Sequence, residues 1–555
     1  MIGAARSAQI SLILFFLSVV PLPGQPREPK SALTKAMENG IVVDRTLTGV
    51  HKMLKAWISK ADPETLLLPD AVPECGREDR RIDWYTPHNS AADNYPYLVA
   101  SAYFTDRALY DGRMIDMLRN EIRYTNVSGA VPGNFNLKDR TLGPKSIFGA
   151  AEYAKDGLIA ITELLGRTPW FYRMVDMTAS TMEQAPTATR HGLLPDPGAE
   201  VNGDMLQVLV RLATMTGDRR FQEWAERIGD AYIGEVLPNC YGLPSYSYDF
   251  STGKGEDRVR LRDHGNEIVV GLVLLYALEN YQRTERAARY RPVLARMLDR
   301  ILESANQDGL LYDEIRASDL KPLKTRLSDN WGYVYGAVYT FYMVTGEQKY
   351  RDAVLKVLKN LPKYRKHDWE NGGHDGYADA LESALYLVNR EPVPEAIDWI
   401  ESEIKILRAY QRPDGLIECW YGDGNWARTN LLFALWKTQG CFLEGWREGV
   451  RLGAEKRGEE LWLWLECPAG GWTGKLRFDY PRHKREMNFD RNYVRLNEWP
   501  EWFTVDENRI YEITDQAGGA KQLRLGSELK AGISVSGPLQ WLVRAADRQA
   551  DKLPN

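Results

Sequence analysis

TMTGDRRFQEWA, residues 214–225, is nearly repeated as MVTGEQKYRDAV at residues 343–354. Both stretches read Thr-Gly, an acidic residue, two polar residues and then an aromatic residue. A glycine just after a helix readily takes the left-handed conformation that closes the last helical turn. The repeat therefore predicts that the chain makes the same turn between two helices at least twice.

The residues on either side of these turns have helical periodicity. Phe221, Trp224, Ala225, Ile228 and Tyr232 follow the i, i+3, i+4, i+7 spacing of an amphipathic helix. Before the second turn, NWGYVYGAVYTFYMV (residues 330–344) is apolar on nearly every side, which is typical of a buried helix. The repeated unit is therefore a buried inner helix that is joined by a short turn to a half-exposed outer helix.

The same unit recurs along most of the chain of 555 residues. Inner helices are expected to begin near Asp93, Glu152, Asn202, Asn266, Asn330, Gly376 and Asn425, and outer helices near Arg45, Arg107, Pro169, Asp218, Glu285, Glu347 and Pro394. Helix pairs that cannot bury their own apolar faces must stack on one another. Because the inner helices need neighbours on every side, the prediction is a mainly α fold, an α/α toroid of six to seven helical hairpins over residues 40–452. An open solenoid is the alternative.

The pattern changes near residue 453. GAEKRGEE (453–460) is expected to be a polar linker, and ELWLWLE (460–466) alternates as a β-strand does. GKLRFDY, NRIYEIT and GISVSG are further strand candidates, bounded by Gly, Pro and Asn. The sequence predicts a small C-terminal β-sheet domain over residues 458–548. Aromatic residues of RNYVRLNEWPEWFTV (491–505) are expected in its core rather than against the ring.

The N-terminal residues predict export. Arg6, the apolar run 10–20 and the break at Pro21 to Gly24 form the pattern of a signal peptide, assigned to residues 1–24. The apolar run is too short to span a bilayer, although a single membrane anchor is the alternative. The expected location is secreted or periplasmic, with no membrane association after the signal is removed.

The composition of the chain limits the kinds of molecule that it is expected to bind. The formal net charge of −5 gives no electrostatic basis for binding nucleic acid. Tyr and Trp (29 and 17 residues) outnumber Phe (14), which favours clefts where an aromatic ring meets polar groups. The five cysteines show neither a disulfide framework nor zinc-ligand spacing, and Cys419 is expected to be a buried thiol. No metal or cofactor is predicted.

The loops that lead from outer to inner helices are long and carry the unusual chemistry. They contain RIDWYTPHNS (81–90), SYSYDFSTGKGEDRVRLRDHG (245–265), RKHDWENGGHDG (365–376) and LIECWYGDG (416–424). All of them should lie at the end of the ring where the inner helices begin, so free N–H groups and positive helix dipoles face the same cleft. Such a cleft suits oxygen-rich or anionic ligands.

A ring of helical hairpins with TGD/TGE-x-x-[FY] turns, a secretion signal and a short C-terminal β-domain resembles the six-hairpin glycosidase superfamily. Its members are α/α-toroid enzymes that act on polysaccharides and oligosaccharides, and the resemblance covers most of residues 40–545. The turns recur in hydrolases, lyases and epimerases alike. The resemblance therefore implies the fold and a carbohydrate substrate, and no catalytic residue is carried over from it.

Two stretches at helix entries supply the predicted catalytic residues. In RVRLRDHGNE (258–267), Arg258, Arg260 and Arg262 alternate, and His264 and Glu267 follow them, after Asp263. In LSDNWGYVYG (327–336), Asp329 precedes the helix. If the two helices are neighbours about 8–10 Å apart, Glu267 and Asp329 face one pocket at the separation used by inverting glycosidases, about 6.5–9.5 Å.

The predicted catalytic residues are thus Asp329, Glu267 and His264. Helix capping by Asp263, Ser328 or Asp329 is the structural alternative. The predicted substrate-binding residues are Arg262, Trp331, Tyr333, His374, Asp375, Trp420 and Arg428. Other acidic residues at the same end of the ring remain candidates for the general acid: Glu200, Asp204, Asp379, Glu418 and Asp423.

The predicted function is a secreted glycoside hydrolase that acts on uronic-acid-containing glycans by carboxylate acid/base catalysis. In this hypothesis arginines and helix N-termini bind the carboxylate of the sugar. The first alternative is a polysaccharide lyase, in which Tyr333 or His264 removes the C5 proton of a uronic acid. The second is a glycan-binding protein without catalysis.

Overall fold

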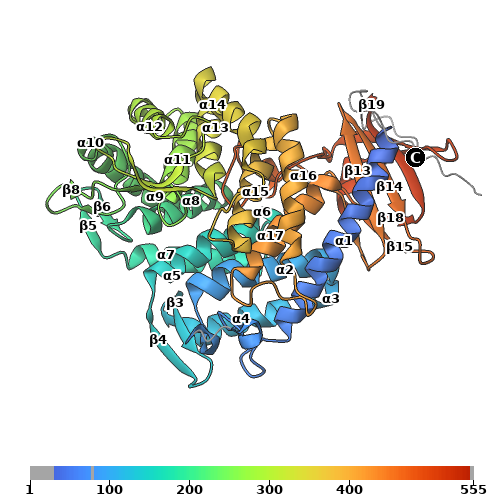
Figure 1. The fold of residues 1–555 in the computed structure, drawn as a ribbon, viewed down its shortest axis with the longest axis horizontal. Coiled ribbons are helices and arrows are strands. Elements are labelled where there is room, and N and C mark those ends of the chain that lie inside the picture. Colours follow the sequence, from blue (N-terminus) through green and yellow to red (C-terminus); the bar gives the residue numbers. More distant parts are fainter. Residues whose placement is uncertain (1–30, 77–79, 550–555) are drawn as a thin grey trace, which may run out of the picture.

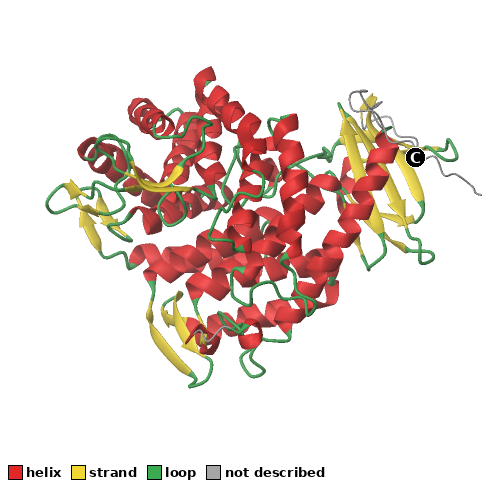
Figure 2. Ribbon diagram, viewed as in Figure 1, coloured by secondary structure: helices red, strands yellow, loops and turns green. Residues whose placement is uncertain are grey.

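The computed structural model describes residues 31–76 and 80–549. The predicted signal peptide lies outside the described residues. A helical part is followed by a β-rich part, which lies at one side of the molecule beside helix α1 (Figures 1 and 2). Among the described residues, no helix combines the length and the hydropathy that crossing a membrane requires.

The inner helices form a closed ring, and this confirms the predicted toroid. Each of them packs against the next, and the last packs back against the first. Within the described residues the ring has seven members, with these bounds: α2 (Tyr95–Thr105), the continuous α5 (Ile147–Glu152), η4 (Tyr153–Leu158) and α6 (Ile159–Leu165), α8 (Ala199–Thr216), α11 (Glu267–Gln282), α13 (Trp331–Thr345), α15 (His374–Val388) and α17 (Asp423–Lys437). The second inner segment begins at Ile147 rather than near Glu152, because Ser146 caps it there.

The outer helices surround this ring and alternate with the inner ones along the chain (Figure 1). They are α1 (Ala32–Ile58), α3 (Arg107–Asp111) with α4 (Arg113–Thr125), α7 (Pro169–Glu183), α9 (Arg219–Ala231), α12 (Glu285–Glu303), α14 (Gln348–Asn360) and α16 (Pro394–Ala409). In α9, Phe221, Ala225 and Ile228 are buried while Arg219 is exposed, as the helical spacing predicts.

Both repeated Thr-Gly turns have the expected geometry. Gly217 ends α8 with φ of 72°, and Gly346 ends α13 with φ of 74°. Their N–H groups donate to Ala213 O and Tyr342 O, at 3.0 and 2.8 Å, which closes the last turn of each helix. Nothing lies within 4 Å of a Cβ placed at either glycine. The backbone conformation, rather than lack of space, therefore requires glycine here.

The long loops from outer to inner helices carry short antiparallel strands on one side of the ring. Their bounds are β1 (Trp84–Tyr85), β2 (Asn126–Ser128), β3 (Val131–Asn136), β4 (Thr141–Lys145), β5 (Thr187–Thr189), β6 (Gly192–Leu194), β7 (Tyr248–Asp249), β8 (Lys254–Gly255), β9 (Val259–Arg260), β10 (Tyr312–Ile315) and β11 (Pro322–Leu327). These strands stiffen the loops that position the site.

The C-terminal strands form two antiparallel sheets around a second hydrophobic core. One sheet has the order β13 (Arg451–Arg457), β14 (Glu460–Glu466), β19 (Leu539–Gln549), β16 (Arg509–Asp515), β17 (Lys521–Leu525), and the other the order β12 (Phe442–Glu444), β15 (Thr473–Arg477), β18 (Ile533–Ser536). Leu461, Leu463 and Leu465 of β14 are fully buried, as their alternation with Trp predicts. The prediction of a polar linker over residues 453–460 is wrong, because residues 451–457 form strand β13 and pair with β14.

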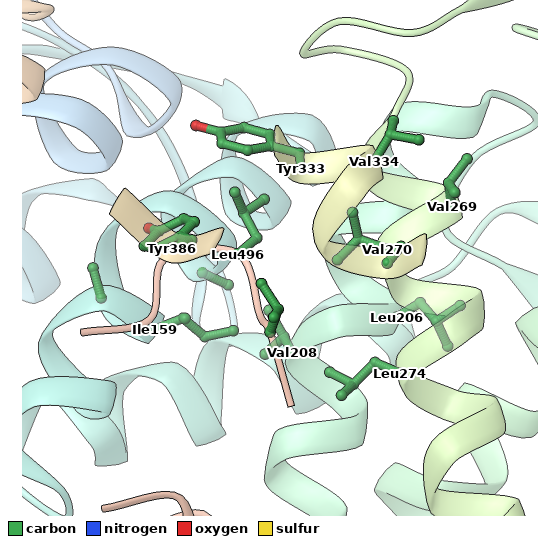
Figure 3. Close-up of a cluster of buried hydrophobic side chains, with 14 of the residues drawn as sticks. Ile159, Leu206, Val208, Val269, Val270, Leu274, Tyr333, Val334, Tyr386 and Leu496 are labelled. Carbon is green, nitrogen blue, oxygen red and sulfur yellow. The ribbon is translucent and has the colours of Figure 1, made fainter. Parts of the chain in front are cut away.

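The segment before β16 corrects a second expectation. Phe489, Tyr493, Val494, Leu496 and Trp499 belong to the core of the ring, whereas Phe503 and Val505 belong to the β-domain core. Figure 3 shows Leu496 in one buried cluster with side chains of the inner helices. Seven helices about 9 Å apart leave a central bore about 10 Å wide once the helix radius is subtracted. A close-packed interior requires that this space be filled, and residues 487–499, here named the plug segment, fill it.

The junction of the two parts gives a first testable prediction. A Cβ on Gly453 of β13 would lie 2.1 Å from Ala36 O and 2.2 Å from Gly40 N of α1. The Gly453→Ala variant should therefore lose about 1–3 kcal/mol of stability, as overpacked sites do. Urea unfolding monitored by circular dichroism measures this loss. Gly471→Ala is the matched control, because nothing lies within 4 Å of its Cβ; equal stability of the two variants would contradict the close contact.

Candidate active site

The N-terminal ends of the inner helices open into one cavity of about 550 Å³. Its aromatic walls include Trp420, Tyr421 and Tyr333. The carboxylates on its lining are Asp93, Glu152, Asp156, Asp263, Glu370, Asp375 and Asp379, and the arginine and lysine side chains are Arg81, Lys155, Arg260, Arg262 and Arg428. A neighbouring hollow of about 590 Å³ shares Glu370, Asp375 and Trp420 with it, so that the two meet along one edge.

Asp70 builds the part of the wall that carries Asp93. Its carboxylate is fully buried and accepts hydrogen bonds from Thr86 N, Thr86 Oγ1, Asn89 Nδ2 and Ser90 N, at 2.8–3.2 Å. Burial raises the pKa of Asp70 to about 6, although these hydrogen bonds oppose the shift. The bonds fix the entry to the π-helical turn η3 (Pro87–Asn94), near the end of which Asp93 faces the cavity.

Asp423 holds the adjacent loop in a similar way. Its carboxylate accepts hydrogen bonds from the N–H groups of Ile417, Glu418 and Cys419 and from Trp57 Nε1. This network places the neighbouring rings of Trp420 and Tyr421, 4.6 Å apart, on the cavity.

Cys419 does not remain a free thiol, contrary to the expectation. It forms a disulfide with Cys75 across a sequence separation of 344 residues. The two residues lie on neighbouring loops at the same rim, which spacing in the sequence does not reveal. The bond ties the loop before η3 to the loop that carries Trp420.

Lys155 is the charge at the centre of the cavity floor. Its side chain is only 5% exposed, and Nζ lies 2.7 Å from Asp156 Oδ2. The same nitrogen lies 3.6 Å from carboxylate oxygens of both Asp204 and Glu267, and 3.9 Å from Glu152 Oε1. One buried cation therefore serves four carboxyl groups, so they cannot all be ionised without large repulsion.

The environment pushes the pKa values of Asp93 and Asp156 in opposite directions. Burial raises the pKa of Asp93 well above its usual value, and the charges of Asp156 and Asp375 raise it further. Burial would also raise the pKa of Asp156, but Lys155 and hydrogen bonds hold it below its usual value. Asp93 thus keeps its proton to higher pH than Asp156 does. Divergent carboxyls of this kind provide an acid and a base in one site.

Arg428 anchors the wall formed by α15 and α17. Its guanidinium lies 2.6 Å from Asp379 Oδ1 and 2.8 Å from Glu382 Oε2. Tyr333 donates to the same Glu382 at 2.9 Å. Burial, Asp379 and Glu382 raise the pKa of Tyr333 well above its usual value. Asp375 accepts a hydrogen bond from Asn425 at 2.8 Å and borders the cavity.

The predicted pair Glu267 and Asp329 is not on the cavity lining, so the expected acid/base geometry is wrong. Glu267 is fully buried and accepts from the N–H groups of His264 and Gly265, at 3.0 and 2.6 Å. It thereby stabilises a turn in which His264 has φ of 64°. Asp329 is 1% exposed, and its carboxylate accepts hydrogen bonds from Arg262 and from the N–H of Asn330. Glu267 thus holds a backbone turn, and Asp329 holds an arginine and a backbone N–H at the helix entry.

Two of the predicted substrate-binding residues are also off the cavity lining. Trp331 is fully buried and packs edge-on against Tyr335. His374 is fully buried between Gly422 O, 2.9 Å from Nε2, and Glu418 Oε2, 3.2 Å from Nδ1. Burial lowers the pKa of His374, but Glu418 and Asp423 raise it to about 9, so it is a cation that holds a loop. The cavity lining does include the predicted Arg262, His264, Tyr333, Asp375, Trp420 and Arg428.

The three alternating arginines do not act together. Arg258 pairs with Glu314 at 2.8 Å, and Arg262 pairs with Asp263, Asp329 and Glu370. The Arg260 side chain lines the cavity and makes no hydrogen bond or ion pair with any described residue, and its buried Nε has no acceptor. Arg260 is therefore the arginine available to a ligand.

His264 is held as a cation. Its Nδ1 contacts Glu200 Oε1, and its Nε2 lies 3.6 Å from Asp263 Oδ2. Burial lowers its pKa, but Asp263 and Glu200 raise it to about 10. Glu152, Glu200 and His264 each place one ligand atom within 4.8 Å of the others, a spacing that a metal ion could use. Lys155 and protonated His264 already supply positive charge to this group.

Sequence reasoning missed Asp93, Asp156, Lys155 and Glu370 as site residues. A signal was present, because Asp93 and Glu152 mark predicted starts of inner helices and Asp156 lies one turn after Glu152. An acidic residue that precedes or enters each buried helix is a candidate for the central cavity. The geometry of the preceding loop decides whether such a residue caps its helix or lines the cavity.

Comparison with known proteins gives only distant likeness. No family model matches the chain, and no curated protein matches it. Solved structures that match include cellobiose 2-epimerase from Bacillus thermoamylovorans, with 10% identity over 57% of this chain and 87% of that chain and a TM-score of 0.41. A D-mannose isomerase matches with 12% identity over 57% and 85% of the two chains and a TM-score of 0.41.

A glycoside hydrolase family 76 mannosidase from Bacteroides thetaiotaomicron matches with 13% identity over 70% of this chain and 98% of that chain. Its TM-score is 0.40. All three matches are distant likenesses in structure. Their identities and scores are too low to transfer a substrate or a catalytic residue.

Proposed function

We propose that this protein is a glycoside hydrolase that acts on uronic-acid-containing oligosaccharides or polysaccharides and works after export. The supporting observation is the pair of cavity carboxyls with opposed pKa shifts, Asp93 and Asp156. Hydrolysis of a glycosidic bond needs one protonated and one ionised carboxyl on the two sides of the bond. The names of the structural neighbours, among them a mannosidase, are compatible with a carbohydrate substrate.

In the proposed reaction, Asp93 donates its proton to the glycosidic oxygen as the bond from that oxygen to the anomeric carbon breaks. A water molecule attacks the anomeric carbon, and Asp156 accepts the proton that the water loses. Lys155, 2.7 Å from Asp156, keeps that carboxylate ionised between turnovers. The net reaction is the hydrolysis of one glycosidic bond by one water molecule.

The walls of the cavity suit an acidic sugar. Trp420 and Tyr421 offer aromatic surface against which a pyranose ring can pack. Arg260 offers a guanidinium that forms no ion pair with a described carboxylate and can bind the carboxylate of a uronic acid. The hollow beyond Glu370 and Asp375 gives room for a further sugar unit.

The same geometry disfavours the lyase alternative. A lyase needs a base that can take the C5 proton of the uronic acid. The hydroxyl of Tyr333 donates to Glu382, and its pKa is raised well above the usual value. The pKa of His264 is raised to about 10, so it is already protonated near neutral pH. Both pKa shifts support hydrolysis over elimination by either of these two side chains.

The direct test incubates the purified protein with a panel of neutral and uronic-acid oligosaccharides. Two signals are followed, namely the reducing ends and the ultraviolet absorbance of unsaturated uronic acids. We expect reducing ends to form from uronic-acid substrates without a rise in absorbance. Growth of the absorbance would indicate elimination instead, and the absence of both signals across the panel would contradict hydrolysis.

Arg260 gives a prediction about specificity. Replacing it with methionine should raise KM for a uronic-acid substrate about 10- to 100-fold, because a charge-assisted contact of about 1.5–3 kcal/mol is lost. The same variant should act nearly normally on a substrate whose carboxylate is reduced to an alcohol. Arg258→Met is the matched control two residues earlier in the same segment, since Arg258 pairs with Glu314 and is not on the cavity lining. An equal loss on both substrates would remove Arg260 from carboxylate binding.

A further inference from the structure

We propose that Asn497, which the plug segment carries into the centre of the ring, is a positioning residue for Asp156. This inference rests on the proposed function, because it concerns the carboxylate assigned there as the base. The proposal implies that a segment C-terminal to the helical ring completes the active site, at the floor of the cavity. The cavity floor is therefore built by residues more than 300 positions apart in the sequence.

The contacts of Asn497 fix its amide in one orientation. Nδ2 donates to Lys155 O at 2.9 Å and to Asp156 Oδ1 at 3.0 Å. Oδ1 accepts from Tyr97 Oη at 3.3 Å. The side chain is 2% exposed, and φ of 58° places Asn497 in the left-handed region, where asparagine is well tolerated. The amide nitrogen and the amide oxygen of Asn497 are thus both hydrogen-bonded to residues of the helical ring.

The neighbouring residues hold Asn497 at this depth. Arg495 forms a two-pronged ion pair with Glu163, with N–O distances of 2.9 Å, and Leu496 O accepts from Arg211. Trp499 Nε1 donates to Ala160 O at 2.8 Å. Every one of these partners lies on an inner helix, so the plug segment is fastened on both sides of Asn497. Figure 3 shows Leu496 within the buried cluster at this position.

The target of Asn497 is an irregular part of an inner helix. Residues Tyr153–Leu158 form the π-helical turn η4, and both Lys155 and Asp156 belong to it. Such turns are uncommon and often mark functional sites, because they shift side chains out of the regular helical register. Asn497 binds both a carbonyl and a side chain of this turn, so it fixes the turn and the carboxylate together.

Removal of the Asn497 amide should change the chemistry of Asp156 in a defined direction. A hydrogen bond donated to a carboxylate favours the ionised form, so its loss raises the pKa. The carboxylate also gains freedom to rotate around its Lys155 contact. The acid side of the pH profile for kcat should therefore move to higher pH, while substrate contacts in the cavity, and hence KM, stay nearly the same.

The test compares two substitutions with a matched control. Asn497→Gly removes the side chain but accepts the backbone conformation, and Asn497→Asp keeps the shape but replaces the donor with an acceptor. Asn488→Gly is the control, because Asn488 also has a positive φ of 56° in the same segment and donates to Thr214 O, away from the cavity. Both Asn497 variants should lower kcat about 10-fold or more with KM within about twofold, and should shift the acid limb upward by about one pH unit. The control should match the wild type.

A second readout does not depend on activity. The pKa of Asp156 is measured by carbon-13 NMR in protein labelled at aspartate carboxyls, with Asp156→Asn used for assignment. We expect this pKa to rise in Asn497→Gly and Asn497→Asp and to stay unchanged in Asn488→Gly. An unchanged pKa, or an equal change in the control, overturns the positioning role. A raised pKa in a protein that cleaves no glycan supports the contact and refutes the proposed function instead.

Discussion

Replacing Asp93 with asparagine is expected to reduce kcat about 1,000-fold while the protein remains folded. General acid catalysis contributes about 10²- to 10⁴-fold, and an amide cannot donate the proton that the leaving oxygen requires. Asp93 lines the cavity, and its carboxylate accepts no hydrogen bond from any described residue, so its role in holding the structure is small. Steady-state kinetics on a cleaved glycan, together with thermal unfolding, measure both parts of this prediction.

The control for this variant is Asp116→Asn. Asp116 lies on outer helix α4, its side chain is 55% exposed, and its partner is the exposed Arg119. Its replacement should leave kcat unchanged. If Asp93→Asn retained the activity of the control, Asp93 would not be the acid, and one of the other lining carboxyls would have to be assigned.

The pH dependence of the wild type follows from the two pKa shifts. The acid must be protonated, and the raised pKa of Asp93 extends activity upward beyond the range of an ordinary aspartate. The base must be ionised, and the lowered pKa of Asp156 extends activity downward. The profile of kcat should therefore be a broad bell, with its alkaline limb due to Asp93. An alkaline limb that persisted unchanged in the residual activity of Asp93→Asn would contradict this assignment.

The second large effect concerns stability. Replacing Glu163 with glutamine should cost about 3–5 kcal/mol at neutral pH, because Arg211 loses its ion-pair partner and Arg495 keeps only Glu498, 3.5 Å away. Glu163 Oε1 lies 2.8 Å from Arg211 Nε and 2.9 Å from Arg495 Nε. Both arginines and Glu163 are at most 2% exposed. The plug segment should loosen from the ring, and urea unfolding followed by tryptophan fluorescence measures the loss.

This stability difference has a defined pH dependence. Burial would raise the pKa of Glu163, but Arg495 and Arg211 lower it from 4.5 to about 2. A carboxyl with a depressed folded-state pKa stabilises the protein above its unfolded value and loses that contribution as the pH falls through the folded value. The difference between wild type and Glu163→Gln should therefore be full above pH 4.5 and should shrink toward pH 2. Glu223→Gln is the control and should show neither effect, because this side chain of α9 is 58% exposed.

Much of the fold follows from local patterns. The inner helix α13 is apolar all round and is buried from Trp331 to Phe341, and the alternation of Leu and Trp in β14 places the leucines inside. The Thr-Gly turns are readable because glycine is required by φ and not by a remote contact. These features depend on neighbours in the sequence, which is why the sequence alone predicts them.

The site is less predictable because its residues have competing uses. Glu267 and Asp93 both stand at the entry of an inner helix, yet Glu267 accepts two backbone N–H groups whereas Asp93 faces the cavity. Only the path of the loop decides between these outcomes. The insertion of Leu496 depends on the width of a seven-helix ring, and the pairing of Cys75 with Cys419 depends on which loops meet at the rim. Such long-range relations leave no local signal.

The measurement that tests the central claim most directly is a crystal structure of Asp93→Asn with a uronic-acid oligosaccharide. The proposed function predicts that a sugar ring lies beside Trp420, its carboxylate contacts Arg260, and a glycosidic oxygen lies next to residue 93 with Asp156 across the bond. An oligosaccharide bound outside this cavity, or bound in it with Arg260 and Asp156 away from the sugar, would contradict the assignment of the ring's central cavity as a hydrolytic site.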